Sequence, residues 1–304
     1  MNCQLDEMAP IALFAYARVE HLRKAVQSLL LNPHSISSPL YVFCDGPANH
    51  KVKRQTEDVR AYVDSIQGFK SVMRVYSDTN LGLAKSIING VTHVLERYDC
   101  VIVMEDDLVV SPHFLTYMNQ GLQMYVDEPR VASIHGYCYP VDERLPETFF
   151  MRGADCWGWG TWKRAWRHFE PDGQALLDRL IASHLIDEFD YGGAYSYSGM
   201  LKKQIKGKNS SWAIRWHASC FLQNLLTLYP SVSLVNNIGN DGSGTHSSPT
   251  SAFDQTTSVS PVSLKPISLA ASTFAYAAFS RYFRRQHSFS QRFFRKIRYF
   301  LKLV

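Results

Sequence analysis

The sequence has no closely spaced cysteine pair and no hydrophobic run long enough to span a bilayer. Its six cysteines are scattered, so we expect neither a disulfide framework nor a zinc site, and a reducing cytosol fits best. The opening MNCQLDEMAP is acidic and lacks an apolar stretch, which argues against a secretory signal peptide. These absences predict a cytoplasmic protein.

Acidic residues are missing from residues 255–304, which contain nine Lys or Arg. The remainder has 23 Lys or Arg against 27 Asp or Glu, so it carries −4 although the whole chain carries +5. Nucleic-acid binding by a folded domain needs a basic face on that domain. We therefore expect no nucleic-acid partner.

Hydrophobic periodicity in the first third of the chain predicts alternating strands and helices. Strands are expected at residues 10–18, 40–44, 71–76 and 101–104, and helices at 20–31, 52–66 and about 83–97. Such alternation is typical of right-handed βαβ units. The predicted fold class is α/β, with a mostly parallel central sheet flanked by helices.

The later part of the chain has a less regular pattern. Helices are expected at 176–191 and 211–224, and a strand at 226–235. Residues 149–166 hold four of the six tryptophans, separated by glycines. Such a cluster suits a surface that stacks on a sugar, or alternatively plain core packing.

The C-terminal end is expected to form a linker, at 251–280, and a basic amphipathic tail, at 281–304. Apolar side chains of the tail share one helical face: Phe289, Phe293, Ile297, Phe300, Leu301 and Val304. Arg and Lys take much of the remaining surface, a pattern typical of a helix lying on an anionic membrane. A terminal helix that docks on the core with a solvated basic face is the alternative.

Three consecutive acids follow the fourth expected strand, in VIVMEDDLVVSPHF at residues 101–114. Like charges at the end of a buried strand are costly unless a cation or hydrogen-bond donors compensate them. Mg²⁺ and Mn²⁺ prefer oxygen ligands, commonly one or two carboxylates plus substrate phosphates. The pattern predicts a metal–diphosphate site where open α/β sheets bind ligands, although a solvated acidic turn is possible too.

In this order the motifs resemble a nucleotide-sugar glycosyltransferase of the A-type fold, in the bacterial family 2 group. The acidic run EDDL is similar to the metal motif of N-acetylglucosaminyltransferase I, and DCWGWGTWKRAW, SWAIRWHASCFLQN and SLVNNIGNDGSGTH resemble enzymes that build surface polysaccharides. The resemblance covers residues 8–250. It implies a nucleotide-binding half at 8–110, an acceptor-binding half at 111–250 and a C-terminal helical extension.

The resemblance also implies contacts to the donor, a UDP-sugar. Asp45 would hydrogen-bond the base or ribose, with turn capping before Gly46 as its alternative role. Arg18 would meet the diphosphate or a base edge, and Asn80 and Lys85 would lie near a helix start that favours phosphate.

The implied cofactor is Mn²⁺ or Mg²⁺, with Asp107 as the direct ligand. Asp106 would contact the sugar or support the ligand, and Glu105 would contact the ribose or a bound water. His246 resembles a late histidine that completes the metal or diphosphate shell. Alternatively, only one of the three acids matters.

An inverting hexosyl or N-acetylhexosaminyl transfer needs a carboxylate that takes a proton from the acceptor. Relatives often place it near the late tryptophan helix, but residues 209–215 read NSSWAIR, with no acid. Asp155 and Asp241 are the candidates. Asp155 is slightly preferred because it lies beside Trp157 and Trp159, which could stack on an acceptor sugar.

The leading hypothesis is thus a metal-dependent cytoplasmic glycosyltransferase that extends a glycan or lipid-linked saccharide, with attachment to the inner face of the cell membrane as a further expectation. A nucleotidyltransferase that makes nucleotide sugars is the second; it usually has a glycine-rich loop after the first strand, where this chain reads AYARVEHLRKA. The third is a non-catalytic glycan-binding protein on the same fold, favoured by the missing acid before Trp212.

Overall fold

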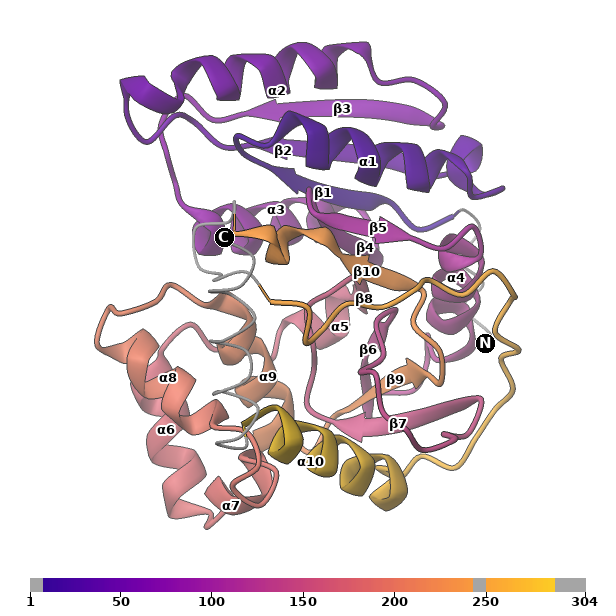
Figure 1. Ribbon diagram of the computed structural model, residues 1–304, viewed down its shortest axis with the longest axis vertical. Coiled ribbons are helices and arrows are strands. Elements are labelled where there is room, and N and C mark those ends of the chain that lie inside the picture. Colours follow the sequence, from indigo (N-terminus) through magenta and orange to yellow (C-terminus); the bar gives the residue numbers. More distant parts are fainter. Residues whose placement is uncertain (1–7, 243–249, 288–304) are drawn as a thin grey trace, which may run out of the picture.

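The computed structural model describes residues 8–242 and 250–287, and within them eight strands form one mixed sheet (Figure 1). The strand order is β3-β2-β1-β4-β8-β6-β9-β7. The bounds are β1 Ile11–Ala15, β2 Pro39–Cys44, β3 Ser71–Tyr76, β4 Cys100–Glu105, β6 Val131–His135, β7 Thr148–Arg152, β8 Trp159–Trp162 and β9 Leu226–Pro230. A separate two-stranded sheet pairs β5 (Leu108–Val110) with β10 (Val235–Asn237).

Most strands of the large sheet run in one direction. β1 is parallel to both β2 and β4, β2 is parallel to β3, and β6 is parallel to β9. β8 lies antiparallel between β4 and β6, which leaves β4 and β6 pointing the same way, and β7 is antiparallel to β9. The predicted α/β class with a mostly parallel sheet flanked by helices is therefore confirmed.

The helices of the first half form where the periodicity predicts them. α1 (Val19–Leu30), α2 (Lys53–Ser65) and α3 (Leu83–Arg97) each bury an apolar stripe and leave a polar face outward. α1 and α2 lie side by side near the β2–β3 end of the sheet (Figure 1). α4 (Phe114–Met124) packs against β6 and β8.

The second half contains more elements than its sequence pattern predicts. The expected helix at 176–191 is two helices, α6 (Gly173–Ala182) and α7 (Ile186–Phe189), because His184 between them has φ of 54° and breaks the helix. The expected strand at 226–235 is likewise divided into β9 and β10. The other helices are α5 (Lys163–Trp166), α8 (Tyr197–Ile205) and α9 (Trp212–Leu222), with short 3₁₀ turns at Ser35–Ser37, His50–Val52 and Ile238–Asp241.

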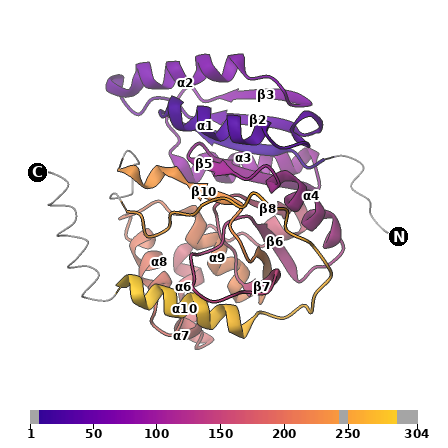
Figure 2. The same ribbon diagram turned by 45° about the vertical axis from the view of Figure 1, so that its right-hand side comes forward.

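The C-terminal segment differs from the predicted linker and tail boundaries. Helix α10 spans Thr273–His287, so it begins inside the expected linker, and the stretch before it follows the domain surface through bonds such as Ser111 Oγ to the Ser258 carbonyl. Helix α10 lies beside β7 (Figure 2), and its Phe279 and Phe283 are buried among residues of β7 and β9. This extension is attached to the core.

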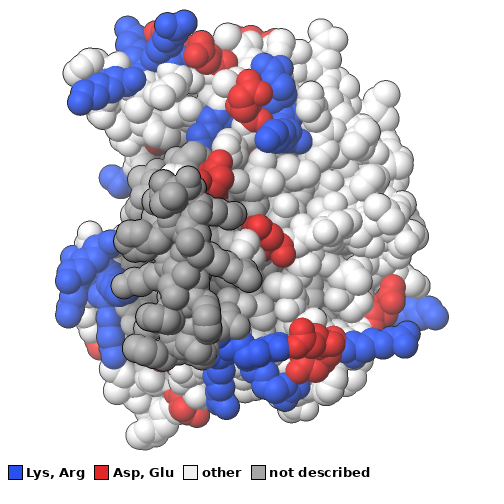
Figure 3. All heavy atoms as spheres, viewed as in Figure 1, with Lys and Arg blue, Asp and Glu red and all other residues white. Residues whose placement is uncertain are grey.

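Two of the three arginines in the described part of α10 are paired with acids, and the third, Arg284, donates to the Gly192 carbonyl. Arg281 contacts Glu143 at 2.6 Å, and Arg285 pairs with Asp142. Figure 3 shows blue and red side chains intermixed along the lower edge of this face, where α10 lies in Figure 1. Residues 281–287 thus follow the core-docking alternative, and the membrane-facing residues predicted from Phe289 onward lie outside the described residues. No described helix is long and apolar enough to cross a membrane.

Candidate active site

The acidic triplet lies at the carboxyl end of β4, next to the end of β1. Glu105 is the last residue of β4 and lies opposite Phe14 of β1. Arg18 follows β1, and its Nη2 contacts Asp106 Oδ1 at 2.5 Å and Asp107 Oδ2 at 2.8 Å. The structure therefore brings Arg18 next to Asp106 and Asp107, which lie 88 and 89 positions later in the sequence. All three residues were predicted to belong to one site.

Burial and mutual repulsion make Glu105 and Asp106 harder to ionise. Burial, reinforced by the charges of Asp107 and Asp106, raises the pKa of Glu105 to about 8. Burial also raises the pKa of Asp106 to about 6, although Arg18 opposes that shift. Burial alone would lower the pKa of Arg18, but the two carboxylates outweigh it and leave that pKa above its usual value. When all three acids are ionised, one guanidinium does not neutralise them.

A divalent cation fits the donor chemistry of this site. The carboxylates supply hard oxygen ligands, and the group carries more potential negative charge than Arg18 compensates. No cluster of three or more metal-ligating side chains occurs among residues 8–242 and 250–287. Such a cage is not required, because Mg²⁺-type sites commonly use one or two carboxylates plus phosphate oxygens and waters. Asp107 and Asp106 would hold the ion, and His246 lies outside the described residues.

The 3₁₀ turn Ile238–Asp241, part of the motif SLVNNIGNDGSGTH, packs over Asp107. The Ile238 amide donates to the Asp107 carbonyl at 2.8 Å. At Gly239, an added Cβ would lie only 2.1 Å from Asp107 Oδ2. Gly239 is therefore needed for this close approach, and no sequence pattern links it to Asp107. Asp241 ends the same turn and lies 3.1 Å from His21 Nε2, with nearly half of its side chain exposed.

Asp45 follows β2 and is saturated with hydrogen-bond donors from the protein. Its Oδ1 accepts from the Gly46 and Leu81 amides at 2.9 and 2.8 Å. Its Oδ2 accepts from the Gly82 amide at 2.8 Å and Asn80 Nδ2 at 3.2 Å. These four bonds occupy the acceptor positions of a carboxylate. The predicted contact of Asp45 with the nucleotide base or ribose is therefore replaced by its alternative role in the turn. Asp45 and Asn80 fix the loop before α3.

Lys85 lies in the first turn of α3 and is exposed. Gly82, just before that helix, has φ of 76°, a conformation that suits glycine. The hydrogen bonds from the Leu81 and Gly82 amides to Asp45 thus fix the loop before α3. Lys85 stays accessible, as the phosphate-binding prediction requires.

The tryptophan cluster divides into core and surface residues. Trp159, at the start of β8, is completely buried and stacks on Trp212 with ring centroids 5.4 Å apart. It cannot contact a sugar, so that assignment was wrong and the core-packing alternative holds for it. Trp157 is only partly buried and contacts the Tyr137 and Phe253 rings at 4.8 and 5.8 Å.

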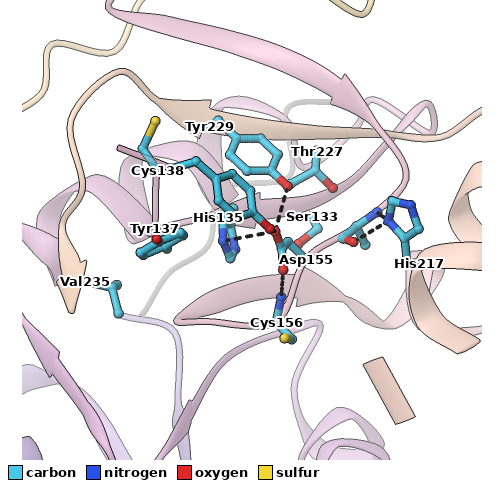
Figure 4. A network of polar contacts seen from close by, with 12 residues as sticks. Ser133, His135, Tyr137, Cys138, Asp155, Cys156, His217, Thr227, Tyr229 and Val235 are labelled. Carbon is cyan, nitrogen blue, oxygen red and sulfur yellow. Dashed lines mark hydrogen bonds and ion pairs between the residues drawn. The ribbon is translucent and has the colours of Figure 1, made fainter. Parts of the chain in front are cut away.

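Asp155 lies in the connection between β7 and β8. Both strands run opposite to β4, so residues 153–158 must return along the sheet. Gly153 makes this return possible, because its φ is 94° and a Cβ there would lie 2.6 Å from the His217 ring. Asp155 is thereby placed against side chains from β6 and β9 (Figure 4).

The Asp155 carboxylate is held by three hydrogen bonds. Its Oδ2 accepts from the Tyr139 hydroxyl at 2.9 Å and the Tyr229 hydroxyl at 3.4 Å, and its Oδ1 accepts from the Cys156 amide at 2.9 Å. His135 Nε2 lies 3.9 Å from Oδ2. Burial lowers the pKa of His135 to about 4, so this imidazole is neutral at pH 7. Sequence patterns did not identify Tyr139, Tyr229 or His135.

Asp155 lies at the same edge of the sheet as the acidic triplet. It is 3.9 Å from Nε2 of His135, the last residue of β6, and β6 runs in the same direction as β4. Burial raises the pKa of the neighbouring Cys156 thiol well above the usual value, and the charges of Asp155, Glu105 and Asp107 raise it further. The acidic triplet with Arg18 and a second carboxylate thus share one edge of the sheet.

Comparisons with known proteins give little support of their own. No protein-family model and no curated protein sequence matches the chain. Among solved structures, it is similar to a mannosyltransferase from Pyrobaculum calidifontis in complex with GDP-Man and Mn²⁺, with 11% identity over 42% of this chain and 34% of that one and a TM-score of 0.32. It is also similar to TarS of S. aureus, with 13% identity over 48% of this chain and 24% of that one and a TM-score of 0.31. The chain thus matches about a third and a quarter of these proteins, too weakly to decide the fold or the function.

Proposed function

We propose that this chain is a glycosyltransferase of the A-type fold, which moves a sugar from a nucleotide-diphosphate donor, a UDP-sugar, to a glycan or lipid-linked saccharide. The observation that carries the proposal is that Arg18, the acidic triplet and Asp155 lie at one edge of the sheet. A cationic side chain and hard oxygen ligands suit a diphosphate, and a separate carboxylate suits proton removal from an acceptor.

The donor end stabilises the departing nucleoside diphosphate. Arg18 offers a planar guanidinium, and Lys85 offers an exposed ammonium group at a helix start. Asp107 and Asp106 would hold Mn²⁺ or Mg²⁺, which when bound supplies positive charge for the diphosphate. Arg18 then exchanges part of its pairing with these acids for phosphate oxygens.

The acceptor end provides the base, Asp155. As the acceptor hydroxyl oxygen attacks the anomeric carbon, its proton passes to the Asp155 carboxylate, and the bond from that carbon to the diphosphate oxygen breaks with inversion. Trp157 would contact the acceptor sugar, since its ring is partly exposed two residues from Asp155. Asp241 is the second candidate base, but it is paired with His21 near the exposed rim.

A donor assay tests this proposal. The purified chain is incubated with UDP-, GDP- and dTDP-sugars, with and without Mn²⁺, and nucleoside diphosphate release is measured. Release of a nucleoside diphosphate from one of these sugar nucleotides and not from the others supports a glycosyltransferase. Pyrophosphate consumption or formation would indicate a nucleotidyltransferase, and binding without turnover would indicate a non-catalytic glycan-binding protein.

A role in surface polysaccharide synthesis, at the inner face of the membrane, extends the same proposal. It is supported by the basic residues in 288–304 and by the resemblance of the late motifs.

A further inference from the structure

Two hydroxyl groups from distant parts of the chain converge on one oxygen of Asp155. Tyr139 follows β6 and Tyr229 lies in β9, yet both donate to Oδ2; Figure 4 shows Tyr229 beside Asp155. The Cys156 amide donates to the other oxygen, Oδ1, at 2.9 Å. Since each carboxylate oxygen accepts about two hydrogen bonds, the tyrosines fill Oδ2, whereas Oδ1 accepts one amide, and the carboxylate's further contact is the Cys156 thiol, a weak donor.

We infer that Tyr139 and Tyr229 are positioning residues, which hold Asp155 so that Oδ1 is the oxygen that takes the acceptor proton. This inference rests on the proposed function, in which Asp155 is the base. Neither tyrosine exchanges a proton with the acceptor. Their contribution is to fix the rotation of the carboxylate and to stabilise its ionised form before the acceptor arrives.

The surrounding packing fixes the two hydroxyls. The Tyr139 ring contacts Phe279 and Phe283 of α10, with centroids 5.0 and 4.9 Å apart. The Tyr229 ring stacks on Phe149 of β7 at 5.7 Å. Helix α10 therefore supports the base indirectly, which gives the C-terminal extension a role in the active site.

The tyrosines remain donors at neutral pH. Burial, with the nearby Asp155 charge, raises the pKa of both Tyr139 and Tyr229 well above the usual value. His135 does not compete for Oδ2, because its Nε2 is 3.9 Å away and the ring is neutral. The other titratable groups that face Asp155 are Tyr137, Cys156, Tyr191, Tyr195, Tyr197 and His217.

The test compares Tyr139→Phe and Tyr229→Phe with Tyr137→Phe. Tyr137 is buried in the same cluster, but its hydroxyl donates to the Phe253 carbonyl at 2.9 Å and not to Asp155. For each variant, kcat, the donor KM and the pH profile of kcat are measured with the full chain, and the melting temperature reports folding.

We expect kcat to fall roughly tenfold in Tyr139→Phe, with a smaller fall in Tyr229→Phe because its bond is longer, and no change in the donor KM. The acidic limb of the kcat profile should move to higher pH, since the ionised carboxylate loses a donor. Tyr137→Phe should keep both the wild-type kcat and the wild-type limb.

Two failures are distinguishable. If the wild-type chain releases no nucleoside diphosphate from any sugar nucleotide, the proposed function is wrong. If the wild type is active but the Tyr139 and Tyr229 variants match Tyr137→Phe in kcat and pH limb, the positioning role is wrong. Should one variant fail to fold, the other decides, because both hydroxyls bond the same oxygen.

Discussion

Arg18 and Asp107 face each other across the ends of β1 and β4, with Nη2 and Oδ2 2.8 Å apart. The same guanidinium nitrogen contacts Asp106, so one cation links two neighbouring acids of the site. Arg18 therefore supports the fold of the site and competes there with any other positive charge.

Replacing Arg18 by methionine should lower the free energy of unfolding by about 2 kcal/mol, because largely buried carboxylates lose their partner. Chemical denaturation measures this. Arg23→Met is the matched control: its pair with Glu20 is exposed and 3.7 Å long, so the change should stay below about 0.5 kcal/mol. Equal effects in both variants would show that the Arg18 pairs contribute no particular stability.

Substituting Gly239 by alanine should displace the Asp107 carboxylate, because the new Cβ would lie 2.1 Å from Oδ2. We expect roughly tenfold weaker Mn²⁺ binding, measured by titration calorimetry, with the fold retained. Gly199→Ala is the control, since only the rotatable Ser196 hydroxyl obstructs that site. Unchanged Mn²⁺ affinity in Gly239→Ala would argue against Asp107 as a ligand.

His135 should make stability depend on pH in the acidic range. Its ring is neutral in the folded chain down to about pH 4, whereas the unfolded ring takes up a proton below about pH 6.5. The unfolded state thus binds more protons between these values, and stability should fall by up to about 3 kcal/mol as the pH drops through them.

His135→Phe should remove this part of the pH dependence, while His168→Phe, at an exposed position, should retain it. Denaturation curves from pH 7 to pH 4 supply the comparison. Parallel curves for the wild type and His135→Phe would disprove the buried neutral imidazole as the cause.

Deleting residues 288–304 should abolish binding to anionic vesicles, because this segment carries five Lys or Arg and no acid. The truncation leaves α10 in place, so the melting temperature should hold. Vesicle sedimentation with anionic and neutral lipids, at low and high salt, measures the effect. A truncated chain that still sediments with anionic vesicles would show that the membrane contact lies elsewhere in the chain.

Sequence patterns predicted the first half of the fold well, because strands and helices there keep their own periodicity. The strand at 71–76 and the helix at 83–97 match β3 and α3 in full. The patterns missed β6, β7 and β8, whose identity depends on pairing with distant strands. In β8 the sequence Trp-Gly-Thr-Trp is buried throughout, so no polar alternation reveals it.

The same limit applies to the site. Adjacent acids at a strand end are visible in sequence, and their nearness to Arg18 follows from parallel strands. The saturation of Asp45 by four donors is invisible, because it depends on how the loop before α3 folds back. Tyr229 is 74 residues from Asp155, and only the sheet order brings them together.

The most direct test is calorimetric titration of UDP into the wild type, Asp107→Ala and the exposed control Asp58→Ala, each with and without Mn²⁺. We predict Mn²⁺-dependent UDP affinity in the wild type and the control, and a loss of roughly tenfold or more in Asp107→Ala with the fold retained. Two results would contradict the account: a wild-type chain whose affinity for UDP, and for GDP and dTDP titrated in the same way, does not change with Mn²⁺, or an Asp107→Ala variant that binds UDP like the wild type.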